Sequence, residues 1–179
     1  MSNNREREPL VDMVHIYVAI RRKKENVEKE LCFRQIVRDD VLDLEVLRAR
    51  IKKVPGIWRI YKTVNKRKVE PARRLLMKKL IDYPTEFQYR IDSLWKNCLL
   101  QKECKGERNF MLDIDTKDVP IELKKMVSYG EITVDEVIET PNGYHYICPE
   151  LDTRLLQGIE DVEVKRDDIK FIELIKNDA

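Results

Sequence analysis

The sequence predicts an α/β (α+β) fold, with two small lobes built around a mixed or antiparallel sheet. Segments rich in β-branched and aromatic residues alternate with segments in which apolar residues recur at helical spacing. The hydrophobic fraction of 42% is ordinary for a folded protein, and 179 residues suffice for one domain with a sizeable core. No internal repeat and no Ser/Gly/Pro-rich linker divides the chain, so we expect a single domain over residues 1–179.

The first part of the chain alternates strands with helices. Strands are predicted over residues 14–20 (VHIYVAI), 30–37 and 57–65 (IWRIYKTVN). Asp40 is a suitable cap for a helix that ends at Pro55-Gly56. A basic amphipathic helix is predicted over residues 69–83, and a second helix begins at Thr85, with Phe87 and Trp95 in its apolar stripe.

After Gly106 the pattern becomes shorter and richer in strands. We predict strands over residues 109–115, 132–139, 143–148, 162–165 and 169–175. One helix interrupts them over residues 119–129, with Asp118 as its cap and Gly130 at its end. We therefore expect a basic, helix-containing lobe over residues 1–106 and a strand-rich lobe over residues 107–179.

Charge is distributed unevenly between these lobes. Residues 1–106 carry 26 Lys and Arg against 15 Asp and Glu, whereas residues 107–179 carry 9 against 18. The basic excess peaks over residues 59–79, where Glu70 is the single acid. A basic cluster beside an acidic segment favours an anionic ligand, with a metal ion between the two regions.

No apolar run approaches the roughly twenty residues that cross a bilayer, and residues 1–10 are polar and charged. We expect a cytoplasmic protein with no membrane partner. The four cysteines form neither a C-x-x-C pair nor a disulfide framework, so we expect reduced thiols.

The segment from Phe110 to Thr116 (FMLDIDT) carries the strongest chemical pattern. Residues i and i+2 of a strand point to the same side, which places Asp113 and Asp115 about 6.6 Å apart along one face. Two such carboxylates suit Mg²⁺ or Mn²⁺, held against substrate phosphates.

Two downstream segments add to this pattern. In Thr140-Pro-Asn-Gly-Tyr-His145 a turn precedes a strand, Gly143 allows close backbone approach to a ligand, and His145 can reach a phosphate. In residues 161–165 (DVEVK) the acids and Lys165 share one face, so Glu163 supplies a third carboxylate.

In order and spacing, these segments resemble the three catalytic motifs of the archaeo-eukaryotic primase (primase-polymerase) superfamily. The first motif of that family is a hydrophobic strand ending in D-x-D, similar to residues 110–115. The second is a turn followed by a strand histidine, similar to residues 140–145. The third is an acid after a hydrophobic residue, similar to Val162-Glu163, with Asp161 as the alternative. A basic stretch, residues 59–67, resembles one that precedes these motifs in some members.

The resemblance implies a minimal catalytic core, of the kind found in phages or mobile elements. Such a primase/polymerase-like nucleotidyltransferase adds nucleotides to a 3′ end or to an initiating nucleotide. Its metal ligands and catalytic residues are expected to be Asp113, Asp115 and Glu163. Its nucleotide-binding residues are expected to be His145, Arg59, Lys62, Arg67 and Lys165. Tyr144 and Tyr146 either stack on a base or simply pack, as aromatic neighbours on a strand more often do. The implied cofactor is Mg²⁺ or Mn²⁺, and the implied partners are nucleoside triphosphates, a DNA or RNA template and a helicase or other replication protein.

Other functions remain open or are excluded by the residues. Lys117 stands where a haloacid-dehalogenase-type phosphatase needs Thr or Val, and neither histidine begins the H-x-S or H-x-T of a two-histidine phosphoesterase. No G-x-x-x-x-G-K-[ST] loop is present. A metal-dependent nuclease, and a non-catalytic adaptor that binds nucleic acid or protein through the basic lobe, both remain alternatives.

Overall fold

The computed structural model describes residues 12–21, 30–38, 40–83, 85 and 90–177, and it divides into two compact units. Unit 1 comprises Met1–Val14 and Lys66–Gly106, and unit 2 comprises His15–Asn65 and Glu107–Ala179. The boundary expected after residue 106 is therefore a boundary between units. Residues 15–65, however, belong to the same unit as the strand-rich part, because their strands pair with the last strand of the chain.

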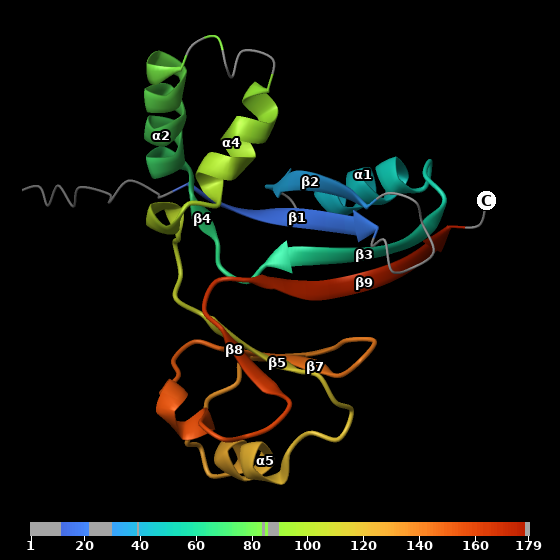
Figure 1. The fold of residues 1–179 in the computed structure, drawn as a ribbon, viewed down its shortest axis with the longest axis vertical. Helices are drawn as coiled ribbons and strands as arrows, with labels where there is room; N and C mark the ends of the chain where they lie inside the picture. The colour runs from blue at the N-terminus through green and yellow to red at the C-terminus, as the bar shows by residue number, and fades with distance from the viewer. Residues whose placement is uncertain (1–11, 22–29, 39, 84, 86–89, 178–179) are drawn as a thin grey trace, which may run out of the picture. The chain divides into compact units, whose positions relative to one another are not determined.

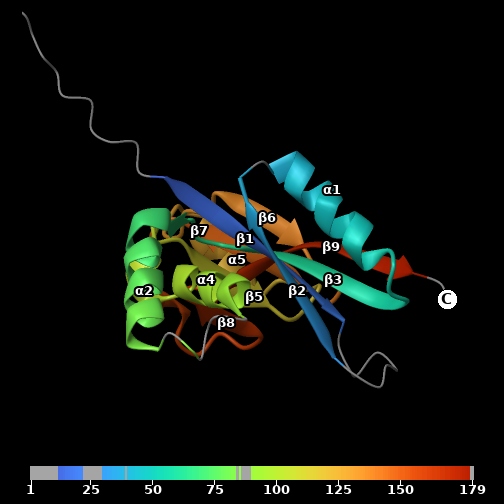
Figure 2. The same ribbon diagram turned by 90° about the horizontal axis from the view of Figure 1, so that it is seen from above.

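The first sheet of unit 2 is antiparallel, in the order β2-β1-β3-β9, with α1 against one face (Figures 1 and 2). Its elements are β1 (Met13–Arg21), β2 (Leu31–Val37), α1 (Asp40–Ile51), β3 (Gly56–Thr63) and β9 (Ile169–Asn177). Leu47 and Ile51 of α1 pack on Trp58 and Ile60 of β3. Because side chains alternate along a strand, Arg59 and Tyr61 lie on the opposite face.

The second sheet of unit 2 is also antiparallel, in the order β6-β7-β5-β8. Its strands are β5 (Phe110–Ile114), β6 (Glu136–Glu139), β7 (Tyr144–Cys148) and β8 (Val162–Lys165). The helix α5 (Ile121–Ser128) and the short 3-10 turn η3 (Thr153–Leu156) cover one face, where Leu123 and Leu156 meet Leu112 and Ile114. Two antiparallel sheets with helices on their faces confirm the α+β class.

Two local predictions in this region are wrong. The strand expected over residues 132–139 begins only at Glu136, because Ile132 lies in a bend and turns into the core beneath the sheet. The expected cap Asp118 does not cap α5, which starts at Ile121 after Pro120 and has no side-chain cap. Gly130 does end this helix, with a positive φ of 74° that suits glycine.

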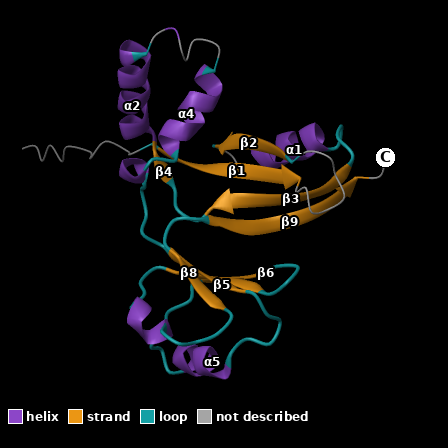
Figure 3. Cartoon of the chain, in the orientation of Figure 1, coloured by secondary structure: helices purple, strands orange, loops and turns teal. Residues whose placement is uncertain are grey.

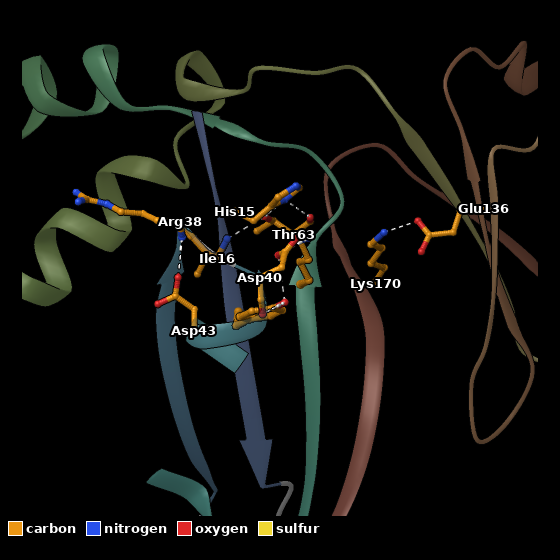
Figure 4. A network of polar contacts seen from close by, with 10 residues as sticks. His15, Ile16, Arg38, Asp40, Asp43, Thr63, Glu136 and Lys170 are labelled. Carbon is orange, nitrogen blue, oxygen red and sulfur yellow. Dashed lines mark hydrogen bonds and ion pairs between the residues drawn. The ribbon is translucent and has the colours of Figure 1, made fainter. Parts of the chain in front are cut away.

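Among the contacts that join the two sheets of unit 2 are an apolar cluster, a side-chain amide and an ion pair. Apolar packing brings Val64, which follows β3, onto Met111 and Ile147 of the second sheet. The buried amide of Asn65 donates to the carbonyl of Asn109 (3.1 Å) and accepts the Asn109 N–H (2.7 Å), as a neighbouring strand would. Lys170 of β9 forms an ion pair with Glu136 of β6 (Figure 4).

Unit 1 contains a pair of helices, α2 (Val69–Asp82) and α4 (Ile91–Leu99), which lie side by side (Figures 1 and 3). The short strand β4 (Arg67–Lys68) pairs with the first two residues of β1, and the 3-10 turn η2 (Lys102–Cys104) follows α4. Part of the helix predicted from Thr85, including Phe87, falls outside the described residues. Among the described residues no helix is both long and apolar enough to span a membrane.

His15 is held where β1 and β3 stop pairing (Figure 4). The Nδ1 of His15 lies 2.9 Å from the carbonyl oxygen of Thr63, and the Thr63 hydroxyl accepts the N–H of Ile16 at 3.1 Å. A carbonyl only accepts, so Nδ1 carries the proton. Burial, with the nearby charge of Lys62 adding to it, lowers the pKa of His15 from 6.5 to about 4.

We predict that His15 makes the folded protein less stable in mild acid. Between the unfolded pKa of 6.5 and the folded pKa of about 4, the unfolded chain binds the extra proton, so stability falls as pH falls through this window. Because His15 is partly exposed, we expect this loss of folding stability to be on the order of 1–2 kcal/mol.

Urea unfolding of wild type and His15→Gln, measured near neutral pH and near pH 5, provides the test. Gln retains a donor for the Thr63 carbonyl but does not titrate. The wild type should lose more stability than the variant on acidification, and equal losses in the two proteins contradict the assignment.

Candidate active site in a cleft of unit 2

The central strand of the second sheet sets Asp113 between two polar neighbours. In the β5 register, Asp113 lies opposite His145 of β7 and opposite Glu163 of β8. Residues that lie directly opposite in antiparallel strands share a face. The structure thus places these three side chains on the face of the sheet that α5 leaves uncovered.

His145 is buried, and its ring lies between two groups. The backbone N–H of Phe171 donates to its Nδ1 at 3.1 Å. Since β9 is an edge strand, this N–H has no neighbouring strand to bond on that side. On the other side of the ring, Nε2 lies 3.3 Å from Oδ1 of Asp113, a long but feasible N–H···O separation.

The ionisation of Asp113 follows from this contact. The hydrogen bond from His145 lowers the pKa of the Asp113 carboxyl, against the raising effect of partial burial, and the charge of Lys165 adds to the lowering. Asp113 is therefore ionised at neutral pH.

Glu163 and Lys165 form an ion pair along β8. This pair, ahead of smaller contributions from Asp113 and Asp168, raises the pKa of Lys165. The Glu163 side chain is 65% exposed and is engaged by the lysine, although its backbone is next to Asp113. Asp161, the alternative third acid, is exposed in the turn before β8, and its carbonyl accepts the N–H of Asp115 at 3.1 Å.

An open cleft of about 310 Å³ lies in unit 2. Both sheets line it, together with the β6–β7 turn. The lining residues that the sequence predicted are Asp113, Asp115, His145, Arg59 and Lys165. Five of the eight predicted site residues therefore meet at one surface.

The remaining predicted residues lie elsewhere. Lys62 is on the α1 face of the first sheet, where its Nζ lies 2.7 Å from Oδ1 of Asp40, because it neighbours Tyr61 and so points away from the cleft. Arg67 lies in β4 of unit 1 and is 2% exposed. Tyr144 and Tyr146 pack against the core beneath the second sheet, which agrees with a packing role and not with stacking on a base.

Several residues that line the cleft had no role assigned from the sequence: Tyr61, Phe171, Met111, Asp168 and Ile169. The turn of the second motif also lines it, through Thr140, Pro141 and Asn142. Tyr61 and Phe171 form an edge-to-face aromatic pair with ring centroids 5.9 Å apart. Tyr61 follows Arg59 by two residues in a predicted strand, so the sequence could have placed both side chains on the same face.

The β6–β7 turn is held against the end of β5 by Gly143. The Thr140 hydroxyl accepts the Gly143 N–H at 3.0 Å, and the Gly143 carbonyl accepts the Thr140 N–H at 2.9 Å. A Cβ at Gly143 would lie 1.8 Å from the carbonyl oxygen of Ile114. The close approach that this glycine allows is therefore to the chain itself, and not to a ligand as the sequence suggested.

Two features bear on the expected metal ion. Asp113 and Asp115 both line the cleft and supply carboxylate oxygens, which Mg²⁺ and Mn²⁺ prefer. Among the described residues, however, no group of three or more His, Cys, Asp or Glu is placed to hold a metal. Magnesium is often held by one or two carboxylates plus phosphates of a ligand, so these two carboxylates fit a cation that binds together with a phosphate-bearing ligand.

Comparison of the chain with protein-family models gives no match, and comparisons with curated proteins and with solved structures give no significant match either.

We predict that Gly143→Ala destabilises the protein by about 2–3 kcal/mol, because the added methyl group meets a backbone carbonyl that cannot swing aside as a side chain would. Chemical denaturation measures the change. The neighbouring exposed residue provides the control, since Asn142→Ala should cost less than about 0.5 kcal/mol. An equally small cost for both variants would show that the turn does not pack on β5 as described.

Proposed function

We propose that this cleft performs divalent-metal-dependent nucleotidyl transfer, as a primase/polymerase-like enzyme. One observation carries the proposal: two carboxylates, a histidine and two basic side chains, separated by up to about a hundred residues in sequence, line a single open cleft. The order of motifs described above, which resembles the archaeo-eukaryotic primase superfamily, supports the same conclusion.

Asp113 and Asp115 would hold Mg²⁺ or Mn²⁺. When bound, such an ion lowers the pKa of an attacking hydroxyl and stabilises the charge that develops on the leaving pyrophosphate. Asp113 suits this role because its lowered pKa keeps it ionised, and Asp115 because it is exposed at the strand end. Glu163 can serve as a third ligand only when its ion pair with Lys165 is broken.

The basic side of the cleft would bind the triphosphate. Arg59 enters it from β3 and Lys165 from β8, so positive charge is supplied by both sheets. His145 adds a neutral N–H donor. Donors held in place by the fold stabilise phosphate charge with little reorganisation, and they also position the α-phosphate for attack by a hydroxyl.

We predict that Asp113→Ala and Asp115→Ala each reduce Mg²⁺- or Mn²⁺-dependent nucleotide incorporation by on the order of 100-fold or more, because each removes a cation ligand. Extension of a labelled primer on DNA and RNA templates measures the effect. Asp118→Ala removes an exposed carboxylate outside the cleft and should retain wild-type incorporation.

Incorporation that survives in either cleft variant would refute the assignment. Circular dichroism and thermal unfolding show whether each variant is folded, so that loss of activity is not confused with loss of structure.

A non-catalytic nucleic-acid-binding adaptor is the second candidate, favoured by the pairing of Glu163 with Lys165, which leaves the third carboxylate engaged. Incubation with the same labelled primer distinguishes between these functions. Extension supports the polymerase-like enzyme, shortening supports a nuclease, and binding with neither, unaffected by changes at Asp113 or His145, supports the adaptor.

A further inference from the structure

The ring of His145 can donate only from Nε2, because a backbone N–H is bonded to its other nitrogen. Because the N–H of Phe171 donates to Nδ1 of His145, that nitrogen must present a lone pair. The single proton of the neutral ring is then on Nε2. His145 therefore offers an N–H to the cleft side.

The same N–H already faces a carboxylate. Nε2 of His145 lies 3.3 Å from Oδ1 of Asp113, and both residues line the cleft. At this length the contact is weaker than an ordinary hydrogen bond to a charged acceptor, so a competing acceptor displaces it at small cost. The carboxylate also repels an incoming anion.

We propose that the contact between Asp113 and His145 is a gate that couples cation binding to anion binding, an inference that rests on the proposed function. While Asp113 is without a cation, its charge holds the Nε2–H and repels a polyphosphate. When Asp113 binds a cation, that charge is neutralised, and His145 donates its Nε2–H to a phosphate oxygen instead. By thermodynamic reciprocity, the polyphosphate then strengthens cation binding by the same factor.

This coupling differs from the bridging of an ion between protein and phosphate, because it acts through a residue that does not bind the metal. It can therefore be measured without any metal. Removal of the Asp113 side chain should release the Nε2–H by itself, whereas removal of an equal charge elsewhere in the cleft should not.

The test is calorimetric titration with inorganic tripolyphosphate in EDTA. Asp113→Ala should bind it about tenfold more tightly than wild type, since one hydrogen bond to a charged group becomes available. Asp113→Asn removes the charge and leaves only a weaker, neutral acceptor for Nε2–H, so its affinity should lie between those of wild type and Asp113→Ala. Asp115→Ala removes a cleft charge without touching His145, and it should stay within about threefold of wild type.

The double variant Asp113→Ala, His145→Ala identifies the donor. Its affinity for tripolyphosphate should not show the tenfold increase expected for Asp113→Ala. Equal gains in Asp113→Ala and Asp115→Ala, a gain that survives without His145, or no measurable binding by Asp113→Ala would each overturn the gate.

A second measurement needs no variant, in case Asp113→Ala does not fold. Addition of Mg²⁺ alone should shift the Nε2–H resonance of His145 and leave the ring of His15 unchanged. An unchanged His145 resonance at saturating Mg²⁺ also overturns the proposal.

The outcomes separate the gate from the proposed function. Primer extension without the calorimetric pattern removes the gate alone. The calorimetric pattern without primer extension leaves a coupled cation and polyphosphate site, and removes the polymerase-like activity.

Discussion

The imidazole of His145 joins the parts of the cleft on which its chemistry depends. Its Nδ1 accepts the outward N–H of the edge strand β9, and its Nε2 faces the carboxylate of β5. One ring thereby links the two sheets of unit 2, satisfies a backbone donor that would otherwise be buried without a partner, and helps to keep Asp113 ionised. The Asn65 amide and the packing of Val64 on Met111 support the same junction.

The cleft balances opposing charges at short range. Carboxylates from the end of β5 meet basic side chains from both sheets, and neither sign is in large excess. Such a surface suits a ligand that itself combines positive and negative charge, as a metal–polyphosphate complex does. Lys165 of β8 pairs with Glu163 and also lines the cleft, so a rotation of its side chain would change both the proposed anion site and the number of carboxylates available to the proposed cation.

Local sequence patterns were sufficient for much of the fold. Strand and helix periodicity located nearly every described element within a few residues, and the i, i+2 spacing correctly placed Asp113 and Asp115 along one surface. The pattern did not reveal that residues 15–65 fold with the C-terminal strands, because that depends on the pairing of β3 with β9, more than a hundred residues apart. Strand alternation alone puts Lys62 and Arg59 on opposite faces of β3, so this difference was predictable. The packing of Tyr144 and Tyr146 was not, because it depends on which face of the second sheet α5 covers. The pairing of Glu163 with Lys165 is local, because these residues are two positions apart in β8 and share one face, as the alternation of residues 161–165 indicated.

The geometry of His145 underlies both the catalytic proposal and the gate, and nitrogen NMR tests it most directly. The chain has two histidines, so in a ¹⁵N-labelled His15→Gln protein the remaining imidazole is that of His145. We expect a single neutral tautomer, with the proton on Nε2 and none on Nδ1, because Nδ1 accepts the N–H of Phe171. A proton on Nδ1, or rapid exchange between the two tautomers, would contradict it.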